Sequence, residues 1–535
     1  MTTTPLLLRG GTVYSPADPF ATAMVVVDGR VGWVGSEGAA DAAAGPGVRV
    51  EHLDGALVTP AFVDAHAHLT DTGLALAGVE LRGARSATDV LDALEAAARQ
   101  RPGLPLVGHG WDEETWTDRT LPTRSEIDRA AGGAAVYLAR VDVHSALVSQ
   151  ALVDRVPDVT DADGFDRVGP VSRAANHRLR RASRDMLTPG QRRALHGEAL
   201  AAAARVGVGQ VHEMGAPHIA GWDDLELLLR WTASDDSVGD VIGYWGELGA
   251  VDAASRAGAR GCAGDLCIDG SLGSRTAALR DPYADEPSTT GAAYIDPDEA
   301  SAHVVACTVA GLQAGFHCIG DAAVHTAVAA IEAAAEQCGR AAVQACRHRL
   351  EHVEMVDDPL VARMAALGVV ASVQPAFDAE WGGPDGMYVS RLGAPRAATM
   401  NPFSAFARAG VTLAFGSDSP VTPFAPWEAV RAAAFHHQPE HRMTARGAFA
   451  AHTRGGWRAA GIDDAGVLVP GAPASFAVWD TAGSLVVQAP DERVAAWSTD
   501  PRSGVPGLPD LRDDAPVPTC RRTVVRGRTI YDAAR

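Results

Sequence analysis

The chain has few cysteines and no long apolar run. Its 535 residues include seven cysteines, which are scattered and form no C-x-x-C pair. This spacing argues against a disulfide framework or a zinc ribbon and indicates reduced thiols. No apolar stretch approaches the roughly 20 residues of a membrane-spanning helix. The first residues, MTTTPLLLRGG, lack the basic segment of a signal peptide. We therefore expect a cytoplasmic protein with no membrane partner.

Positive charge is also scarce. The sequence carries 46 lysine and arginine residues against 66 aspartate and glutamate residues, a net charge of −20. This sign argues against nucleic acid and anionic membranes as partners. Hydrophobic residues make up 47% and charged residues 21%, as in soluble globular proteins. The length predicts two or three structural units.

Two sequence motifs are missing, one typical of dinucleotide-binding proteins and one typical of α/β-hydrolases. No G-x-G-x-x-G follows a first strand, which weakens the case for a dinucleotide-binding sheet. The stretches GSDSPV and DGSLGS do not match the G-x-S-x-G turn around a nucleophilic serine. The chemistry must therefore be sought among other residue types.

Both ends of the chain are rich in strand-forming residues. Residues 1–58 and 470–535 contain short β-prone runs, with Asp-Gly and Gly-Gly turn signals at the N-terminal end. Because both ends share this pattern of short strand-forming runs, we expect them to pair into one small, composite β-sandwich domain.

Residues 59–469 alternate short apolar runs with alanine-rich helical segments. This alternation predicts an α/β protein, either a (β/α)8 TIM-like barrel or a doubly wound sheet, and the missing glycine motif favours the barrel. The interval from about 75 to 205 is too long for one strand–helix step. We expect it to hold an inserted subdomain over the barrel mouth.

Polar residues end several of the apolar runs. His66 and His68 close the run AFVDAHAH, and their spacing puts both imidazoles on one face of a strand. Such a pair alone is as often a surface feature as a metal site. Active sites of barrels gather at the carboxyl ends of the strands, and imidazoles and carboxylates bind zinc and related metals. The other strand-end candidates are Asp265, Asp269, His317, Glu351, His352 and Asp418.

Each of these residues alone also has a structural explanation. His317 could be a core histidine, Asp269 a turn residue and Asp418 a helix cap. Four separate apolar runs nevertheless end in histidine or aspartate. This repetition favours a metal centre over independent accidents.

The ordered motifs TPAFVDAHAH, FHCIGD, RLEHVE and GSDSPV resemble the amidohydrolase superfamily. DGSLGSRTAAL, DPYADEPSTTG and GHGWDEETW resemble amidohydrolase family 3, the branch of the N-substituted formamide deformylases. The resemblance covers nearly the whole chain and implies a barrel hydrolase. The metal ligands that it implies are His66, His68, His317, His352 and Asp418.

Position 265 departs from the family pattern. Many relatives carry there a carboxylated lysine that bridges two metal ions, whereas this chain has Asp265. Aspartate is much shorter than a carboxylated lysine. We therefore expect one divalent ion rather than two, with zinc as the first choice and Asp265 as a further candidate ligand.

The resemblance implies hydrolysis of an amide or formamide-like C–N bond of a small molecule by activated water. Asp418 would move the proton, and His352 would donate a hydrogen bond to the oxyanion. Residues expected to contact the substrate are His109, Trp111, Asp112, His144, Arg275, Gln374 and Trp381, although simple packing explains each equally well. We expect His177, His196, His303, His436, His437 and His441 at the surface.

Two other functions stay open. A metal-dependent deaminase uses the same ligands, but such enzymes often carry H-x-x-E after the fifth strand, where this chain reads HCIGD. A non-catalytic protein with a decayed metal site is supported only by Asp265. A homo-oligomer is compatible with the sequence.

Overall fold

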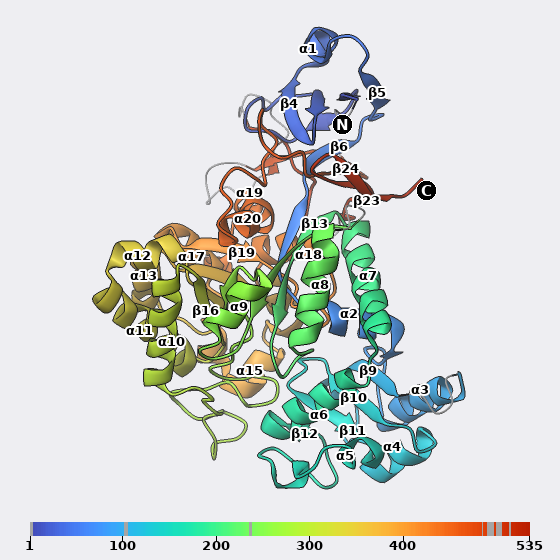
Figure 1. Cartoon of the computed structure of the whole chain (residues 1–535), viewed down its shortest axis with the longest axis vertical. Coiled ribbons are helices and arrows are strands. Elements are labelled where there is room, and N and C mark those ends of the chain that lie inside the picture. Colours follow the sequence, from blue (N-terminus) through green and yellow to red (C-terminus); the bar gives the residue numbers. More distant parts are fainter. Residues whose placement is uncertain are drawn as a thin grey trace.

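A parallel barrel of eight strands forms the centre of the molecule (Figure 1). The computed structural model describes residues 4–100, 105–234, 238–483, 485–488, 497–498, 505–512 and 515–534. In chain order the barrel strands are β7 (Phe62–Ala67), β13 (Val208–Gly215), β14 (Asp240–Trp245), β15 (Gly261–Cys262), β16 (Gln313–Cys318), β17 (Arg349–His352), β18 (Val370–Val373) and β19 (Thr412–Phe415). The predicted α/β barrel is confirmed.

The barrel closes between its first strand and the segment that follows its last. The amide of Asp418 donates to the carbonyl of His66 at 2.8 Å, and the amide of His68 donates to the carbonyl of Ser419 at 2.9 Å. The Asp64 carboxylate accepts the amide of Ser417 at 3.1 Å. These bonds bring the residue after strand eight beside the histidines of strand one.

Helices cover the outside of the barrel. They include α7 (Pro189–Arg205), α8 (Trp222–Ser234), α10 (Pro297–Ala310), α11 (Asp321–Cys338), α13 (Asp358–Leu367), α17 (Phe403–Ala409) and α18 (Pro426–Ala434). Most barrel strands are buried along their whole length because the helices cover one face and the barrel interior the other. The Asp357 carboxylate caps the start of α13, and Gly368 ends it with φ 70°. None of the helices in the described parts of the chain has the length and apolar character needed to cross a bilayer.

A second sheet lies between β7 and β13 in the sequence. Its order is β12-β11-β10-β9-β8. The strands are β8 (Val79–Glu80), β9 (Leu106–Trp111), β10 (Val136–Arg140), β11 (Ser145–Val148) and β12 (Val171–Ser172). They alternate with α3 (Ala87–Gln100), α4 (Arg124–Ala130), α5 (Gln150–Val153) and α6 (Arg173–Asp185), at one end of the barrel (Figure 1).

Ion pairs connect this inserted sheet to the barrel. Helix α2 (Leu69–Ala77) carries Asp71, whose carboxylate is held by Arg180 and Arg184 of α6. Asp71 and Arg184 are each 3% exposed. Both guanidinium groups donate charged hydrogen bonds to the one carboxylate. These bonds offset the free-energy cost of removing the three charges from water.

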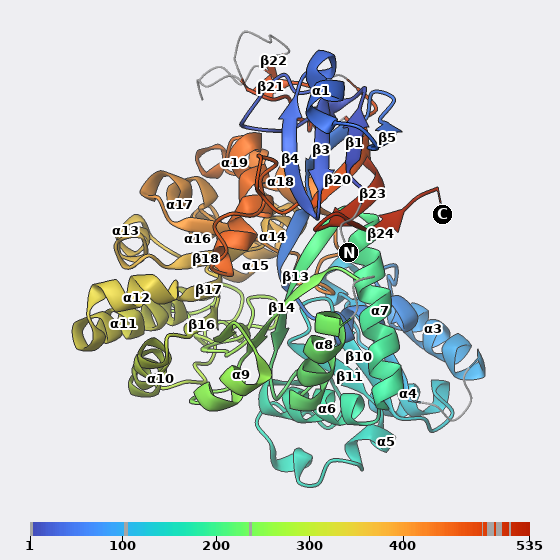
Figure 2. The same cartoon turned by 45° about the horizontal axis from the view of Figure 1, so that its top comes forward.

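Strands from the two chain ends share one sheet. Its order is β2-β6-β20-β23-β24, with β2 (Thr12–Val13) and β6 (Leu57–Pro60) from one end and β20 (Phe476–Asp480), β23 (Thr519–Val525) and β24 (Arg528–Asp532) from the other. Another sheet, β4-β3-β1-β5, which is formed by the N-terminal end alone, lies beside this shared sheet (Figure 2). Its strands are β1 (Leu6–Arg9), β3 (Ala23–Val27), β4 (Arg30–Gly35) and β5 (Arg49–His52). The domain limits at 58 and 470 stay a prediction, and residues 489–496 and 499–504 of that predicted domain lie outside the described residues.

Candidate metal centre and active site

Four buried side chains converge at the carboxyl end of the barrel. His66 lies near the end of β7, His68 directly follows that strand, Asp265 follows β15, and Asp418 follows β19. Nε2 of His66 lies 3.3 Å from Asp265 Oδ1 and 3.4 Å from Asp418 Oδ1. Nε2 of His68 lies 3.3 Å from Asp265 Oδ2 and 3.2 Å from Asp418 Oδ1. Two imidazoles and two carboxylates that face one point form a donor set that suits zinc and other borderline divalent metals.

Close backbone packing brings Asp265 to this point. Gly264 turns the chain before it with φ 85°. A Cβ at Gly246, just after β14, would lie 2.8 Å from the carbonyl carbon of Asp265. Only glycine at position 246 therefore allows this approach, and the short aspartate side chain can reach the first-strand histidines.

The ring orientation of His66 is set by residues behind it. Nδ1 of His66 lies 2.9 Å from Glu351 Oε2, and the carboxylate of Glu351 accepts two further hydrogen bonds from the buried Arg349. An ionised carboxylate can only accept, so His66 keeps a proton on Nδ1, and the lone pair of Nε2 becomes available to a metal ion that displaces the second ring proton. Neither Nε2 of His66 nor Oδ1 of Asp265 has a hydrogen-bond partner among the described residues.

The electrostatics of the cluster favour positive charge. Burial opposes protonation of His68, but the carboxylates of Asp265 and Asp418 outweigh it and raise its pKa to about 10. The pKa of His66 is raised well above its usual value against the same opposition. Burial opposes ionisation of Asp418, yet His66 and His68 lower its pKa. A divalent cation would supply the positive charge that these carboxylates attract, and the donor set fits one.

His352 lies beside this cluster and stays neutral. Its ring is 4.9 Å from the ring of His66, and His66, His352 and Asp418 offer ligand atoms within 4.8 Å of one another. Burial and the neighbouring His317 lower the pKa of His352 to about 3. Its Nδ1 lies 2.8 Å from Gln374 Oε1, so the proton is on Nδ1 and Nε2 keeps a lone pair.

The backbone at two of these positions is left-handed. His352 has φ 70° and Asp418 has φ 56°. Such conformations cost non-glycine residues about 1–3 kcal/mol and cluster at functional sites.

His317 is placed differently from the other predicted ligands. Its ring lies 4.5 Å from that of His352, and its Nδ1 lies 3.5 Å from Asp269 Oδ1. Asp269 accepts the amides of Ala278, Ile319 and Gly320, which fixes its carboxylate. Two groups of possible ligands that include His66 have their ligand atoms within 4.8 Å of one another. One is His66, His68 and Asp265, and the other is His66, His352 and Asp418. Among the described residues, His317 belongs to neither group.

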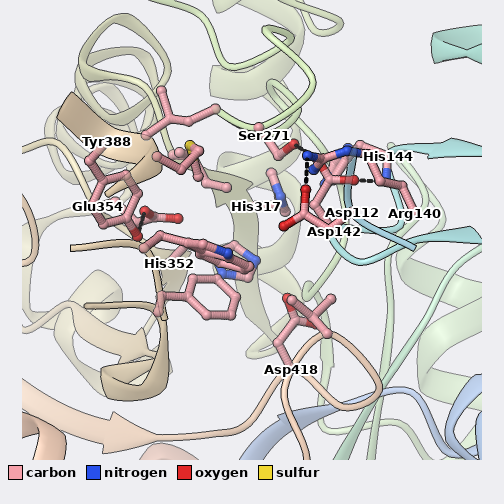
Figure 3. Close-up of a pocket in the computed structure, with 17 residues that line it drawn as sticks. Asp112, Arg140, Asp142, His144, Ser271, His317, His352, Glu354, Tyr388 and Asp418 are labelled. Carbon is pink, nitrogen blue, oxygen red and sulfur yellow. Dashed lines mark hydrogen bonds and ion pairs between the residues drawn. The ribbon is translucent and has the colours of Figure 1, made fainter. Parts of the chain in front are cut away.

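A cavity opens beside the cluster, between the barrel and the inserted sheet (Figure 3). His317, His352 and Asp418 line it from the barrel, whereas Asp142 and His144 line it from the insertion. Aromatic residues come from α14 (Pro375–Trp381) and α15 (Met387–Leu392). An apolar cavity with a few convergent polar groups is the usual form of a small-molecule site.

The residues predicted to contact the substrate divide into two groups. Asp112, His144 and Trp381 line the cavity. Gln374 instead supports His352. Among the described lining residues we do not find the remaining three. Trp111 packs in the core of the insertion, His109 is 5% exposed in β9, and Arg275 pairs with Asp285 at the surface.

Sequence reasoning missed four polar residues of the cavity. Arg140 and Asp142 belong to the run YLARVDVH, and Ser271 follows the DG pair. Glu354 lies two residues after His352 in RLEHVE, where it could have been collected as a strand-end carboxylate. Burial raises the pKa of Glu354 to about 7.

Three of the histidines expected at the surface are buried, and that expectation is wrong for them. His196, His303 and His436 are 0%, 2% and 1% exposed. His196 bonds Thr70, and His436 lies 3.2 Å from Asp378. His303 accepts the amide of Gly249 on Nδ1 and bonds a carbonyl through Nε2. Hydrogen-bond partners inside the core allow these imidazoles to be buried.

The comparisons with known proteins identify the family of the chain. A model of the amidohydrolase family matches residues 49–531. The chain belongs to this family. The "N-substituted formamide deformylase" of Arthrobacter pascens is 26% identical over 436 residues, which cover 76% of this chain and 79% of that protein.

Two further relatives are similar over most of their length. "Protein LONG AFTER FAR-RED 3" of Arabidopsis thaliana is 28% identical and covers 89% of this chain and 87% of its own. An uncharacterized metal-dependent hydrolase from Pyrococcus furiosus superposes with a TM-score of 0.71 at 27% identity, covering 89% of this chain and 98% of that one. Membership of a metal-dependent amidohydrolase superfamily, with a small-molecule substrate and a divalent metal, follows from these matches.

Proposed function

We propose that this protein hydrolyses the C–N bond of an amide or formamide-like small molecule with the help of one bound divalent ion, zinc by preference. The observation that carries the proposal is the convergence of His66, His68, Asp265 and Asp418 beside the cavity. The name of the Arthrobacter relative, a deformylase of N-substituted formamides, supports the bond type.

The bound ion would lower the pKa of a water molecule and polarise the amide carbonyl. Asp418 is ionised beside the protonated imidazoles of the metal-free site, which lower its pKa, and a bound cation would keep it ionised in their place. It lines the cavity and can therefore accept a proton from the attacking water and deliver it to the leaving amine. In this proposal one carboxylate serves both proton transfers.

The role of His352 follows from its tautomer. An oxyanion needs a donor, which would require a proton on Nε2, whereas the contact with Gln374 Oε1 places the proton on Nδ1. We therefore propose His352 as a supporting ligand or hydrogen-bond acceptor at the ion, and no longer as the oxyanion donor. His317 and His144 also line the cavity and are the other imidazoles that can face the substrate.

The experiment is a product analysis on zinc-loaded, desalted protein with N-benzylformamide and with a panel of simple N-acyl amines. Formate or another acid released together with an amine supports the proposal. Aminated heterocycles are assayed in parallel. Release of ammonia from them as the sole nitrogen product would indicate the deaminase instead. If the zinc-loaded protein turns over none of these compounds above the level of Asp418→Ala, the proposed bond specificity is wrong.

A further inference from the structure

Glu354 is a buried carboxylate on the cavity wall. It follows β17 and is 3% exposed. Its Oε2 accepts a hydrogen bond from the hydroxyl of Tyr388 at 2.6 Å, and that hydroxyl accepts one from Asn401 Nδ2 at 3.3 Å. The two bonds fix the carboxylate. The one side-chain hydrogen bond of Glu354 among the described residues is made by Oε2, which leaves the other oxygen, Oε1, to the cavity that the residue lines.

Several other buried carboxylates of this molecule have a cation partner, whereas Asp64 and Glu213 are held by backbone amides. Glu351 pairs with Arg349 at 2.5 Å, and Asp142 pairs with Arg140 at 3.2 Å. Removing a carboxylate from water is costly unless a cation and hydrogen bonds compensate it. Glu354 receives only one hydroxyl from the protein. A positively charged group of a bound ligand would complete its coordination.

The arginine of the cavity is not available to a ligand. Arg140 donates to Glu113 at 2.9 Å and to Asp112 at 2.7 Å, besides its pair with Asp142. One guanidinium faces three carboxylates, so this wall is acidic in sum. A substrate with a carboxylate or phosphate would meet repulsion here and find no free cation among the described lining residues.

The wall near Glu354 is aromatic. Phe377 and Trp381 lie with ring centroids 4.7 Å apart, and both line the cavity together with Tyr388. Aromatic faces attract ammonium groups and shield them from water. In Figure 3, Glu354 and Tyr388 lie across the cavity from Arg140 and Asp142, and both pairs are separate from Asp418.

We propose that Glu354 determines substrate choice: its Oε1 accepts an N–H from a positively charged amino group that lies on the substrate away from the bond to be cleaved. The substrate class is then an amide of a molecule with a second, cationic amine. This inference rests on the proposed function, because it names the substrate of the same site.

The test uses three ligands that cannot be hydrolysed, so that binding is measured apart from turnover. They are benzyl alcohols with an aminomethyl, a methyl or a carboxylate group in the para position, titrated calorimetrically into the zinc-loaded, full-length protein. A charged hydrogen bond of roughly 1.5–3 kcal/mol corresponds to at least about tenfold tighter binding of the aminomethyl ligand than of the methyl ligand. The carboxylate ligand is the control for direct coordination to zinc, and its affinity should be the same in Glu354→Gln.

Glu354→Gln keeps the size of the side chain and removes its charge. We expect it to abolish the preference for the aminomethyl ligand and to leave the affinity of the methyl ligand unchanged. Tyr388→Phe, which frees the carboxylate, should reduce the preference only in part. Glu336→Gln removes the same charge from the exposed side of α11 and should change nothing.

Three results would overturn the inference. They are equal binding of all three ligands, no binding of any, and a preference for the aminomethyl ligand that persists in Glu354→Gln. If the ligands bind as expected while the matching formamides are not hydrolysed, only the proposed reaction fails.

Discussion

Asp265 faces His66 directly, with Oδ1 of the carboxylate 3.3 Å from Nε2 of the imidazole. An aspartate therefore reaches the first-strand histidines, although its side chain is too short to extend across the barrel. The chain contains no lysine at all. A carboxylated lysine cannot bridge two ions in this protein, so the arrangement supports one ion with Asp265 among its ligands.

The first prediction concerns the metal content. Zinc-loaded and desalted wild-type protein should hold about one ion per chain. Asp265→Ala should lose most of this metal, because it removes the one carboxylate whose two oxygens face both imidazoles and leaves Asp418 as the only carboxylate of the four converging side chains. Elemental analysis of the purified chain gives the answer.

The control for this measurement is Asp252→Ala, an exposed aspartate of α9 (Val251–Ala257). It should retain the wild-type metal content. A wild-type value near two that falls to one in Asp265→Ala would contradict the single-ion proposal and assign Asp265 to a second ion.

The second prediction separates metal binding from proton transfer. Asp418→Asn keeps an oxygen that can face His66 and His68 but cannot take a proton at neutral pH. Loss of a general base typically costs about 10²–10⁴-fold in rate. We expect kcat to fall by that amount while most of the metal is kept. An Asn variant with at least a tenth of the wild-type kcat would exclude Asp418 as the base.

The barrel and several site positions could be predicted from the sequence because each depends on local pattern. Short apolar runs become strands, and polar residues at their ends gather at one edge of a parallel barrel. His66, His68 and Asp418 follow this rule. Their roles at the metal remain proposals, but their placement needs no knowledge of loop paths.

Other features depend on contacts between distant segments and left no periodic signal. The approach of Asp265 requires a glycine at position 246, and Arg140 reaches the cavity only because the inserted sheet folds over the barrel. The burial of His196 and His303 depends on hydrogen bonds to other elements. No spacing rule for one segment can supply such partners.

The third prediction concerns the carboxylate behind the metal site. Glu351→Gln replaces the acceptor of the His66 Nδ1 proton and leaves Arg349, which is fully buried, without its anion. Loss of such a supporting carboxylate typically weakens metal binding by about 10–100-fold. Breaking a buried pair typically costs about 3–5 kcal/mol of folding free energy.

Competition with a zinc-sensitive dye measures the first effect, and urea unfolding of the metal-free protein measures the second. Glu332→Gln, whose partner Arg363 lies on the outer helices, is the matched control and should cost less than about 1 kcal/mol. Unchanged zinc affinity in Glu351→Gln would show that Glu351 does not orient His66.

The last prediction tests whether the two chain ends stabilise each other. Trp479 of β20 is 1% exposed, and its indole N–H donates to Oγ1 of Thr59 in β6 at 2.8 Å. Its ring also packs against Phe62, the first residue of β7, with centroids 5.8 Å apart. Replacing a buried tryptophan by alanine costs about 3–5 kcal/mol. Because Trp479 lies at the opposite end of β7 from His66, Trp479→Ala should unfold at lower urea concentration while the folded fraction keeps its metal content.

Trp33→Ala, in β4 of the N-terminal sheet and only partly buried, is the comparison and should lose less unfolding free energy. Equal stability of Trp479→Ala and wild type would show that the C-terminal strands add nothing to the barrel, and the composite domain would have to be given up.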